Sequence, residues 1–236
     1  MTNIFYKTKK EVILKQAHVI AIDGPSGCGK GTSGLYVAKF LQFNYLDSGK
    51  YYRGVALKSK LLGVNPDDVD ALEKIAQEID IKISEQGVLL DMVDYTKIIC
   101  TEEIGTLASI VGKHPRVRNA IHVHELGLRK YPGLVADGRD AGRVFDTPYR
   151  FFIKTDVRVR AAWRLAQLRE KGDTKSTYDM VLKQLEERDY TDINRAANPL
   201  MPHEDSIIID NTHFKDRYDT GKLILKHYLE MITSYA

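Results

Sequence analysis

Short apolar runs alternate with amphipathic segments along most of the chain. The apolar runs that match buried strands lie at 19–22, 43–46, 133–137, 151–153 and 207–210. They are continuous and rich in β-branched or aromatic residues, as in parallel strands that are covered on both faces. After the first run, Leu35, Ala38 and Leu41 recur at helical spacing. This alternation predicts an α/β fold with a doubly wound parallel sheet.

Helix start signals divide the segments between these runs. Asn65 precedes Pro66 and two aspartates, which predicts a helix that is capped by Asn65. Thr101 and the pair Ser176-Thr177 are further N-cap candidates. The predicted helices cover 51–62, 65–78, 101–112, 115–131, 154–170 and 176–189, and a last helix starts near residue 214.

The apolar period changes to two after residue 78. Segments 79–83, 88–92 and 95–99 predict three short strands, which would form a small antiparallel sheet inserted into the α/β chain. Both a binding flap and a purely structural excursion fit this pattern.

Composition adds limits to this picture. A chain of 236 residues, with 43% hydrophobic and 28% charged residues, is typical of one globular domain with small insertions. A formal charge of +3 is too small to argue for a nucleic-acid or membrane partner. Two cysteines give no disulfide framework and no metal-ligand spacing. Residues 1–17 are a polar extension without a signal-peptide pattern, so we expect a cytoplasmic protein.

The first apolar run leads directly into a glycine-rich loop. The stretch Gly24-xxxx-Gly29-Lys30 follows a strand and precedes a helix, which is the arrangement of a phosphate-binding loop. Glycines let backbone N–H groups turn inwards, the helix N-terminus adds free N–H groups, and lysine adds a positive charge. A glycine-rich turn that binds nothing is the alternative. The candidate phosphate-binding residues are Gly24, Pro25, Ser26, Gly27, Cys28, Gly29, Lys30, Gly31 and Thr32.

The residue after the lysine narrows the choice among phosphate-binding loops. Gly31 stands where Ser or Thr usually follows the lysine, and Thr32 comes next. The sequence Gly-Lys-Gly-Thr is common in nucleoside monophosphate kinases. Asp137 ends a predicted core strand, a position at which an aspartate commonly orders Mg²⁺ or its water shell. Thr32 and Asp137 are therefore the candidate Mg²⁺ residues, with contacts mostly through water.

Arginines fall in predicted turns and at the ends of elements. The planar guanidinium pairs with phosphate in a bidentate manner and keeps its charge. Each of these arginines could instead form a surface salt bridge. The set is Arg53, Arg118, Arg139, Arg188 and Arg195. A second series, Arg158, Arg160 and Arg164, could belong to a mobile lid or to a solvated helix face. His122 and His124 are expected to face solvent.

Five ordered motifs support a family resemblance. They are IAIDGPSGCGKGT at 20–32, YLDSGKYYR at 45–53, HPRVRNA at 114–120, LVADGRDAG at 134–142 and ERDYTDINRAANPL at 187–200. With these motifs the chain resembles bacterial-type cytidylate kinases from residue 18 to residue 236. The resemblance implies a core, a nucleotide-binding insert at about 50–118 and a short lid at about 158–176.

The resemblance also implies a reaction and a site. The expected reaction transfers the γ-phosphoryl group of Mg-ATP to CMP or dCMP, with Lys30, Arg139, Arg188 and Arg195 as the catalytic residues. The loop residues 24–32 would bind ATP. Ser48, Arg53, Arg139, Arg188 and Arg195 would surround the acceptor phosphate, Asp140 the ribose, and Ser109, Arg118 and Asp192 the cytosine edge. A monomer is expected. A kinase for another nucleoside monophosphate and a regulatory module without turnover are the alternatives.

The chain departs from the family pattern at four positions: Ala141, Arg143, Trp163 and Thr191. Trp163 and Thr191 stand where basic residues are usual in the family. These departures affect the predicted lid and the handling of the phosphate donor, and leave the predicted cytosine site intact.

Overall fold

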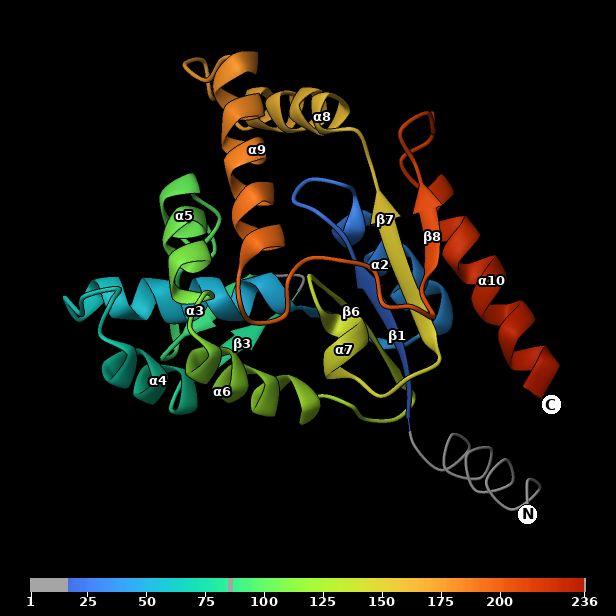
Figure 1. Cartoon of the computed structure of the whole chain (residues 1–236), viewed down its shortest axis with the longest axis horizontal. Helices are drawn as coiled ribbons and strands as arrows, with labels where there is room; N and C mark the ends of the chain where they lie inside the picture. The colour runs from blue at the N-terminus through green and yellow to red at the C-terminus, as the bar shows by residue number, and fades with distance from the viewer. Residues whose placement is uncertain (1–16, 85–86, 236) are drawn as a thin grey trace.

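A five-stranded parallel sheet forms the centre of the computed structural model, which describes residues 17–84 and 87–235 (Figure 1). The strand order is β2-β6-β1-β7-β8, and every neighbouring pair is parallel. The strands are β2 (Asn44–Asp47), β6 (Gly133–Gly138), β1 (His18–Asp23), β7 (Tyr149–Lys154) and β8 (Ile207–Asp210). The predicted doubly wound α/β fold is confirmed. Residues 1–16 of the predicted N-terminal extension lie outside the described residues.

Alternate residues of the central strand enter two separate cores. Val19 and Ala21 pack into one hydrophobic cluster, and Ile20 and Ile22 pack into the other. Successive side chains of a strand point to opposite faces, so a strand covered on both faces must be apolar at every position. This explains why β1 reads as a continuous apolar run.

Helices cover both faces of the sheet (Figure 1). α2 (Lys30–Leu41) and α10 (Asp219–Tyr235) share one core cluster. The other cluster takes residues from α3 (Ser48–Leu61), α4 (Val69–Gln77), α5 (Glu102–Val111) and α6 (Pro115–Leu126). The remaining helices are α7 (Ala141–Val144), α8 (Val157–Glu170) and α9 (Tyr178–Asn194).

A small antiparallel sheet lies between α4 and α5 in the sequence. It consists of β3 (Ile81–Ile83), β4 (Val88–Leu90) and β5 (Val93–Asp94). The prediction of a third strand at 95–99 is wrong. Asp94 accepts a hydrogen bond from the backbone N–H of Thr96, and the N–H of Ile99 bonds to the carbonyl of Tyr95. These local bonds turn the chain immediately after residue 94.

Several predicted helix boundaries are also wrong. Asp68, not Asn65, caps α4 by accepting from the N–H of Ala71, while Asn65 accepts from Asp67 in a local turn. α6 ends at Leu126 instead of 131, and α10 begins at Asp219 instead of 214. α9 runs on to residue 194, so Asp192 lies on a helix and not in a loop.

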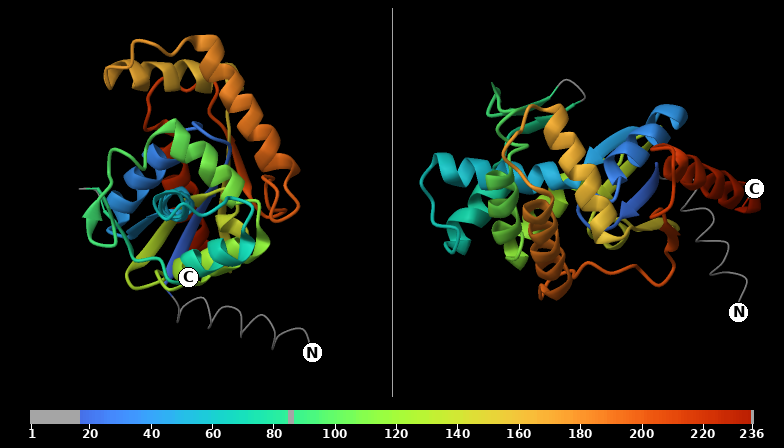
Figure 2. Two further views of the ribbon diagram at one scale, coloured as in Figure 1. Left: turned by 90° about the vertical axis from the view of Figure 1, so that its left-hand side faces the viewer. Right: turned by 90° about the horizontal axis from the view of Figure 1, so that it is seen from above.

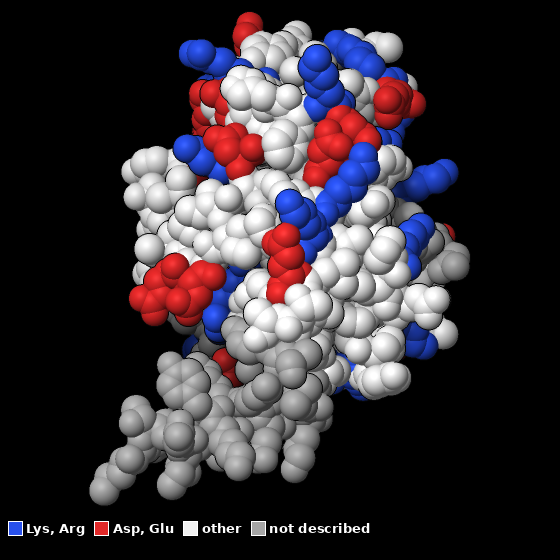
Figure 3. All heavy atoms as spheres, turned by 90° about the vertical axis from the view of Figure 1, so that its right-hand side faces the viewer, with Lys and Arg blue, Asp and Glu red and all other residues white. Residues whose placement is uncertain are grey.

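α8 and α9 together form an arm that rises from the carboxyl side of the sheet (Figures 1 and 2). The two helices pack on each other through Ala161, Val181 and Leu185. On the face shown in Figure 3, basic and acidic side chains are interspersed. No helix in 17–84 or 87–235 is both long and apolar enough to cross a membrane.

Candidate active site

The glycine-rich loop connects β1 to α2 at the carboxyl end of the central strand. Gly29 is the N-cap of α2 and has a left-handed backbone, with φ +91°. A Cβ on Gly24 would lie 2.5 Å from the carbonyl oxygen of Ile153, so only glycine fits there. Because the N-terminus of α2 opens at this loop, its unpaired N–H groups offer an anion-binding position.

Lys30 is buried beside the loop. Its Nζ donates to the carbonyls of Gly24 at 3.0 Å and Pro25 at 2.8 Å. Burial lowers the pKa of Lys30, and the neighbouring guanidinium of Arg139 lowers it further. The side chain therefore ties the loop together and places a positive charge next to the N-terminus of α2.

A large cleft, with a volume of about 700 Å³, opens in front of this loop. The loop, the arm and the segment after β8 all contribute to its lining. Six of the nine loop residues that were predicted to bind ATP line it: Ser26, Gly27, Gly29, Lys30, Gly31 and Thr32. Cys28 is different, because its side chain is buried in the core and its carbonyl accepts from Asn211.

A second and smaller pocket, of about 60 Å³, lies beside the cleft. It brings together eight of the nine predicted acceptor residues: Ser48, Ser109, Arg118, Arg139, Asp140, Arg188, Asp192 and Arg195. The ninth, Arg53, lines the larger cleft. Arg139 and Arg188 line both spaces, so the two cavities meet at these guanidinium groups.

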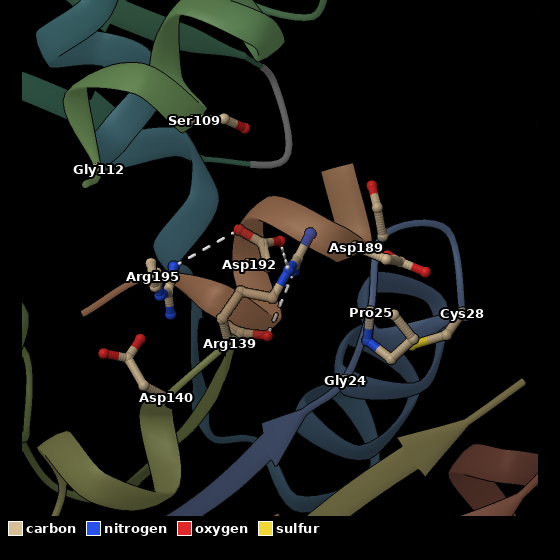
Figure 4. Close-up of polar contacts among 12 residues, drawn as sticks. Gly24, Pro25, Cys28, Ser109, Gly112, Arg139, Asp140, Asp189, Asp192 and Arg195 are labelled. Atoms are coloured by element: carbon tan, nitrogen blue, oxygen red, sulfur yellow. Dashed lines mark hydrogen bonds and ion pairs between the residues drawn. The ribbon is translucent and has the colours of Figure 1, made fainter. Parts of the chain in front are cut away.

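Asp192 joins two arginines at the wall of the smaller pocket (Figure 4). Its carboxylate accepts from Arg139 Nε at 2.9 Å and lies 3.6 Å from Arg195 Nη1. Burial would raise the pKa of Asp192, but Arg139, Arg188 and Arg195 together hold it below its usual range. The carboxylate is therefore ionised at neutral pH, and it keeps Arg139 directed into the site.

Asp140 is the centre of a second network. It accepts hydrogen bonds from Arg118 and from Asn198, the latter at 2.8 Å. His122 Nε2 lies 3.5 Å from the same carboxylate, so the prediction that His122 faces solvent is wrong. Burial opposes the charge of Asp140, but His122 and Arg118 together hold its pKa below the usual range. The guanidinium of Arg118 also lies over the ring of Tyr52, 4.9 Å from its centre.

Arg188 differs from the other arginines of the site. No hydrogen bond or ion pair of its side chain is found within 17–84 and 87–235, and its Nε is buried without a partner. Burial lowers its pKa to about 10, with the neighbouring Arg139 as the next cause. The carboxylates of Asp192 and Glu102 favour its charge from nearby, but neither bonds to it, and a largely buried cation without a bonded partner favours the binding of an anion. The junction of the two cavities is thus a positive site that suits a phosphate group.

The comparisons with known proteins identify the family. The sequence model of cytidylate kinases matches residues 20–220. The chain belongs to the cytidylate kinase family. It is 44% identical to a cytidylate kinase of Cupriavidus necator over 83% of this chain and 88% of that protein. It is 42% identical to the cytidylate kinase of an Enterobacter species over 93% of this chain and 95% of that protein. The protein is therefore a nucleoside monophosphate kinase, which is a phosphotransferase.

A more distant likeness exists among solved structures. A shikimate kinase from Bacteroides thetaiotaomicron matches with a TM-score of 0.42 and 14% identity, over 92% of this chain and 98% of that one.

The arm of this cytidylate kinase family member is attached through Arg160 and Arg164. Arg160 is buried and donates to the carbonyl of Ser26 at 3.0 Å and to Asp189 at 2.6 Å. It therefore fastens the glycine-rich loop to α8 and α9 and does not lie on an exposed helix face. Arg164 forms an ion pair with Glu102 on α5, across the larger cleft. Arg158 is exposed.

Thr32 and Asp137 both line the larger cleft, close to the N-terminus of α2. Asp137 accepts a hydrogen bond from the hydroxyl of Tyr45. Burial and the nearby Asp47 raise its pKa to about 7. Within 17–84 and 87–235 no cluster of three His, Cys, Asp or Glu side chains could hold a metal alone. One carboxylate and one hydroxyl fit Mg²⁺, which keeps most of its waters and arrives with phosphates.

Sequence patterns had missed several side chains of the site. Asp23 accepts from the N–H groups of Ala141 and Gly142, both at 2.8 Å, and so holds the start of α7 beneath the pocket. Glu125 accepts from Ser48. Tyr45, His122 and Asn198 also contact predicted site residues. Asp23 directly follows the continuous apolar run at 19–22, but no sequence signal pointed to Glu125.

Proposed function

We propose that this enzyme transfers the γ-phosphoryl group of Mg-ATP to CMP or dCMP, giving ADP and CDP or dCDP. The observation that carries the proposal is the junction at Arg139 and Arg188. There a cleft that contains the glycine-rich loop meets a smaller pocket, and the Arg188 side chain forms no ion pair within 17–84 and 87–235. A donor phosphate in the cleft and an acceptor phosphate in the pocket would both face these guanidinium groups.

The donor side is assigned to the glycine-rich loop. The N–H groups at the start of α2 and the Lys30 ammonium would bind the outer phosphates of ATP. Lys30 would exchange its contacts with the carbonyls of Gly24 and Pro25 for phosphate oxygens. Thr32 and Asp137 would hold a hydrated Mg²⁺, which supplies charge neutralisation for the phosphates.

The acceptor side is assigned to the smaller pocket. Ser48, Arg139, Arg188 and Arg195 would surround the acceptor phosphate within the pocket, and Arg53 would reach it from the larger cleft. Asp140 would contact the ribose. The phosphate of CMP is largely ionised near neutral pH, so no general base is needed. The arginines would orient its oxygen for in-line attack and neutralise the charge that develops in the transition state.

Base selectivity is assigned to Ser109, Arg118 and Asp192. The carboxylate of Asp192 has acceptor positions beyond those used by Arg139 and Arg195, so it can accept from the exocyclic amino group of cytosine. Arg118 Nε is buried without a partner and can donate to a base acceptor. Uracil lacks the amino donor, and a buried acceptor left unpaired would disfavour it.

Stoichiometry tests this proposal. The purified protein is incubated with Mg-ATP and CMP, and the products are separated by anion-exchange chromatography. We expect ADP and CDP to form in equal amounts, and Arg188→Ala to form far less of both. ADP without CDP would refute the acceptor assignment. The monomeric state, the cytoplasmic location and the domain limits at 50–118 and 158–176 remain predictions.

A further inference from the structure

Glu125 is a buried carboxyl group behind the acceptor pocket. It lies on α6, is 2% exposed, and accepts a hydrogen bond from the hydroxyl of Ser48. Ser48 is the first residue of α3 and lines the pocket directly. Glu125 itself does not line the pocket. It can therefore influence a ligand only through Ser48 or through its charge.

The surroundings of Glu125 set its protonation. The titratable groups that face it are Tyr51 and Tyr52 on α3, Arg118 and His122 on α6, and Asp140 beside α7. Burial raises the pKa of Glu125 to about 7, and Asp140 acts in the same direction. The hydrogen bond from Ser48 and the charges of His122 and Arg118 act in the opposite direction. Glu125 thus changes its charge near neutral pH.

A serine hydroxyl has a single proton to donate. An ionised Glu125 accepts the hydrogen bond from that hydroxyl and leaves only the lone pairs of Ser48 Oγ for the pocket. A protonated Glu125 can donate its own proton to Oγ, which frees the Ser48 proton for another acceptor. We propose that Glu125 is a positioning residue that acts through Ser48: its protonated form directs the Ser48 hydroxyl proton to the phosphate of the acceptor nucleotide. This inference rests on the proposed function.

The charge of Glu125 affects the binding of the acceptor phosphate in the same sense as its hydrogen bond, because both favour binding when Glu125 is protonated. An ionised carboxylate behind Ser48 repels the phosphate dianion, and protonation removes this repulsion. Acceptor binding and proton uptake by Glu125 therefore favour each other, and the proton comes from solvent. At pH 7 about half of the free protein has an ionised Glu125, so binding takes up to about half a proton at this group.

Glu125→Gln gives a matched test, because the amide NH₂ can donate to Ser48 Oγ at every pH. We expect this variant to bind CMP as tightly as the wild type at pH 6, and about tenfold more tightly at pH 8. The free phosphate of CMP titrates in the same way in both experiments. The ratio of the two CMP affinities at each pH therefore reports the effect of Glu125 alone. When Ser48 is first replaced by alanine, adding Glu125→Gln should change CMP affinity much less at pH 8 than it does in the wild type.

Isothermal titration calorimetry of CMP in buffers of different ionisation enthalpy measures both the affinity and the protons taken up. The inference predicts that at pH 7 the wild type takes up more protons than Glu125→Gln, by up to about half a proton. Equal uptake by both proteins, with CMP bound, would overturn the role of Glu125 and leave the proposed function intact. If CMP bound to neither protein, the proposed function would fail, and this inference would fail with it.

Discussion

Replacing Asp192 with asparagine should impair the use of CMP while leaving the binding of ATP nearly unchanged. The change keeps the size of the side chain and one oxygen, and it removes a negative charge that lies among three guanidinium groups. Arg139 Nε donates to this carboxylate over 2.9 Å. The variant would weaken that bond, and its amide could present NH₂ where the cytosine amino group needs an acceptor.

The size of the effect follows from the bond that is weakened. A hydrogen bond to a charged group contributes about 1.5–3 kcal/mol, and about 1.4 kcal/mol corresponds to a factor of ten. We therefore expect kcat/KM for CMP to fall about ten- to hundredfold. ATP affinity should change by less than about twofold, because Asp192 does not line the larger cleft.

A coupled assay of ADP release, with CMP varied, gives kcat/KM. The single tryptophan of the chain, Trp163, lines the larger cleft, and its fluorescence is a direct readout of ATP binding. Glu186→Gln is the matched control, because it removes one exposed carboxylate from the same helix. Equal losses of CMP use and ATP affinity in Asp192→Asn would show that Asp192 does not belong to the acceptor site.

Three further perturbations test other parts of the account. Arg188→Lys keeps the charge but loses the planar fork, so kcat should fall about a hundredfold or more with smaller changes in KM; an unchanged kcat in steady-state assays would contradict this. Tyr45→Phe removes the hydroxyl that orients Asp137, so half-maximal activity should require more Mg²⁺, and an unaltered Mg²⁺ titration would argue against Asp137 as a metal residue. Glu125 has a folded-state pKa raised to about 7 from 4.5, so its ionisation disfavours the folded state as pH rises through this window. Relative to wild type, Glu125→Gln should gain about 3 kcal/mol in free energy of unfolding between pH 4 and pH 8, as measured by urea denaturation, and a pH-independent difference would refute the assigned burial cost.

The core of the fold could be predicted because its signals are local. β1 is covered on both faces, so Ile20 and Ile22 had to be apolar as well as Val19 and Ala21. The third strand of the small sheet could not be predicted in this way. Tyr95 to Ile99 has strand-like composition, but the bond from Thr96 to Asp94 closes a turn there.

The residues of the candidate site were predicted from motifs, whereas the hydrogen bonds and ion pairs that join them could be seen only in the folded structure. The helix predicted at 176–189 would end before Asp192, whereas α9 extends past this residue and its carboxylate bonds to Arg139. In the sequence, His122 is indistinguishable from a polar residue on the exposed side of a helix. In the structure, Asp140 at the start of α7 lies beside it. The hydrogen bond from Ser48 to Glu125 joins residues that lie 77 positions apart, so no local pattern reveals it. The roles of these side chains depend on contacts between residues that are far apart in the sequence.

Selectivity among acceptors tests the central claim most directly. The purified protein is assayed with Mg-ATP and, in turn, CMP, dCMP, UMP and AMP, and kcat/KM is measured for each. The account predicts the highest value for CMP or dCMP, and a value for UMP at least about tenfold lower, because uracil cannot donate to Asp192. Equal use of UMP or AMP, or no ADP release with any of the four, would contradict it.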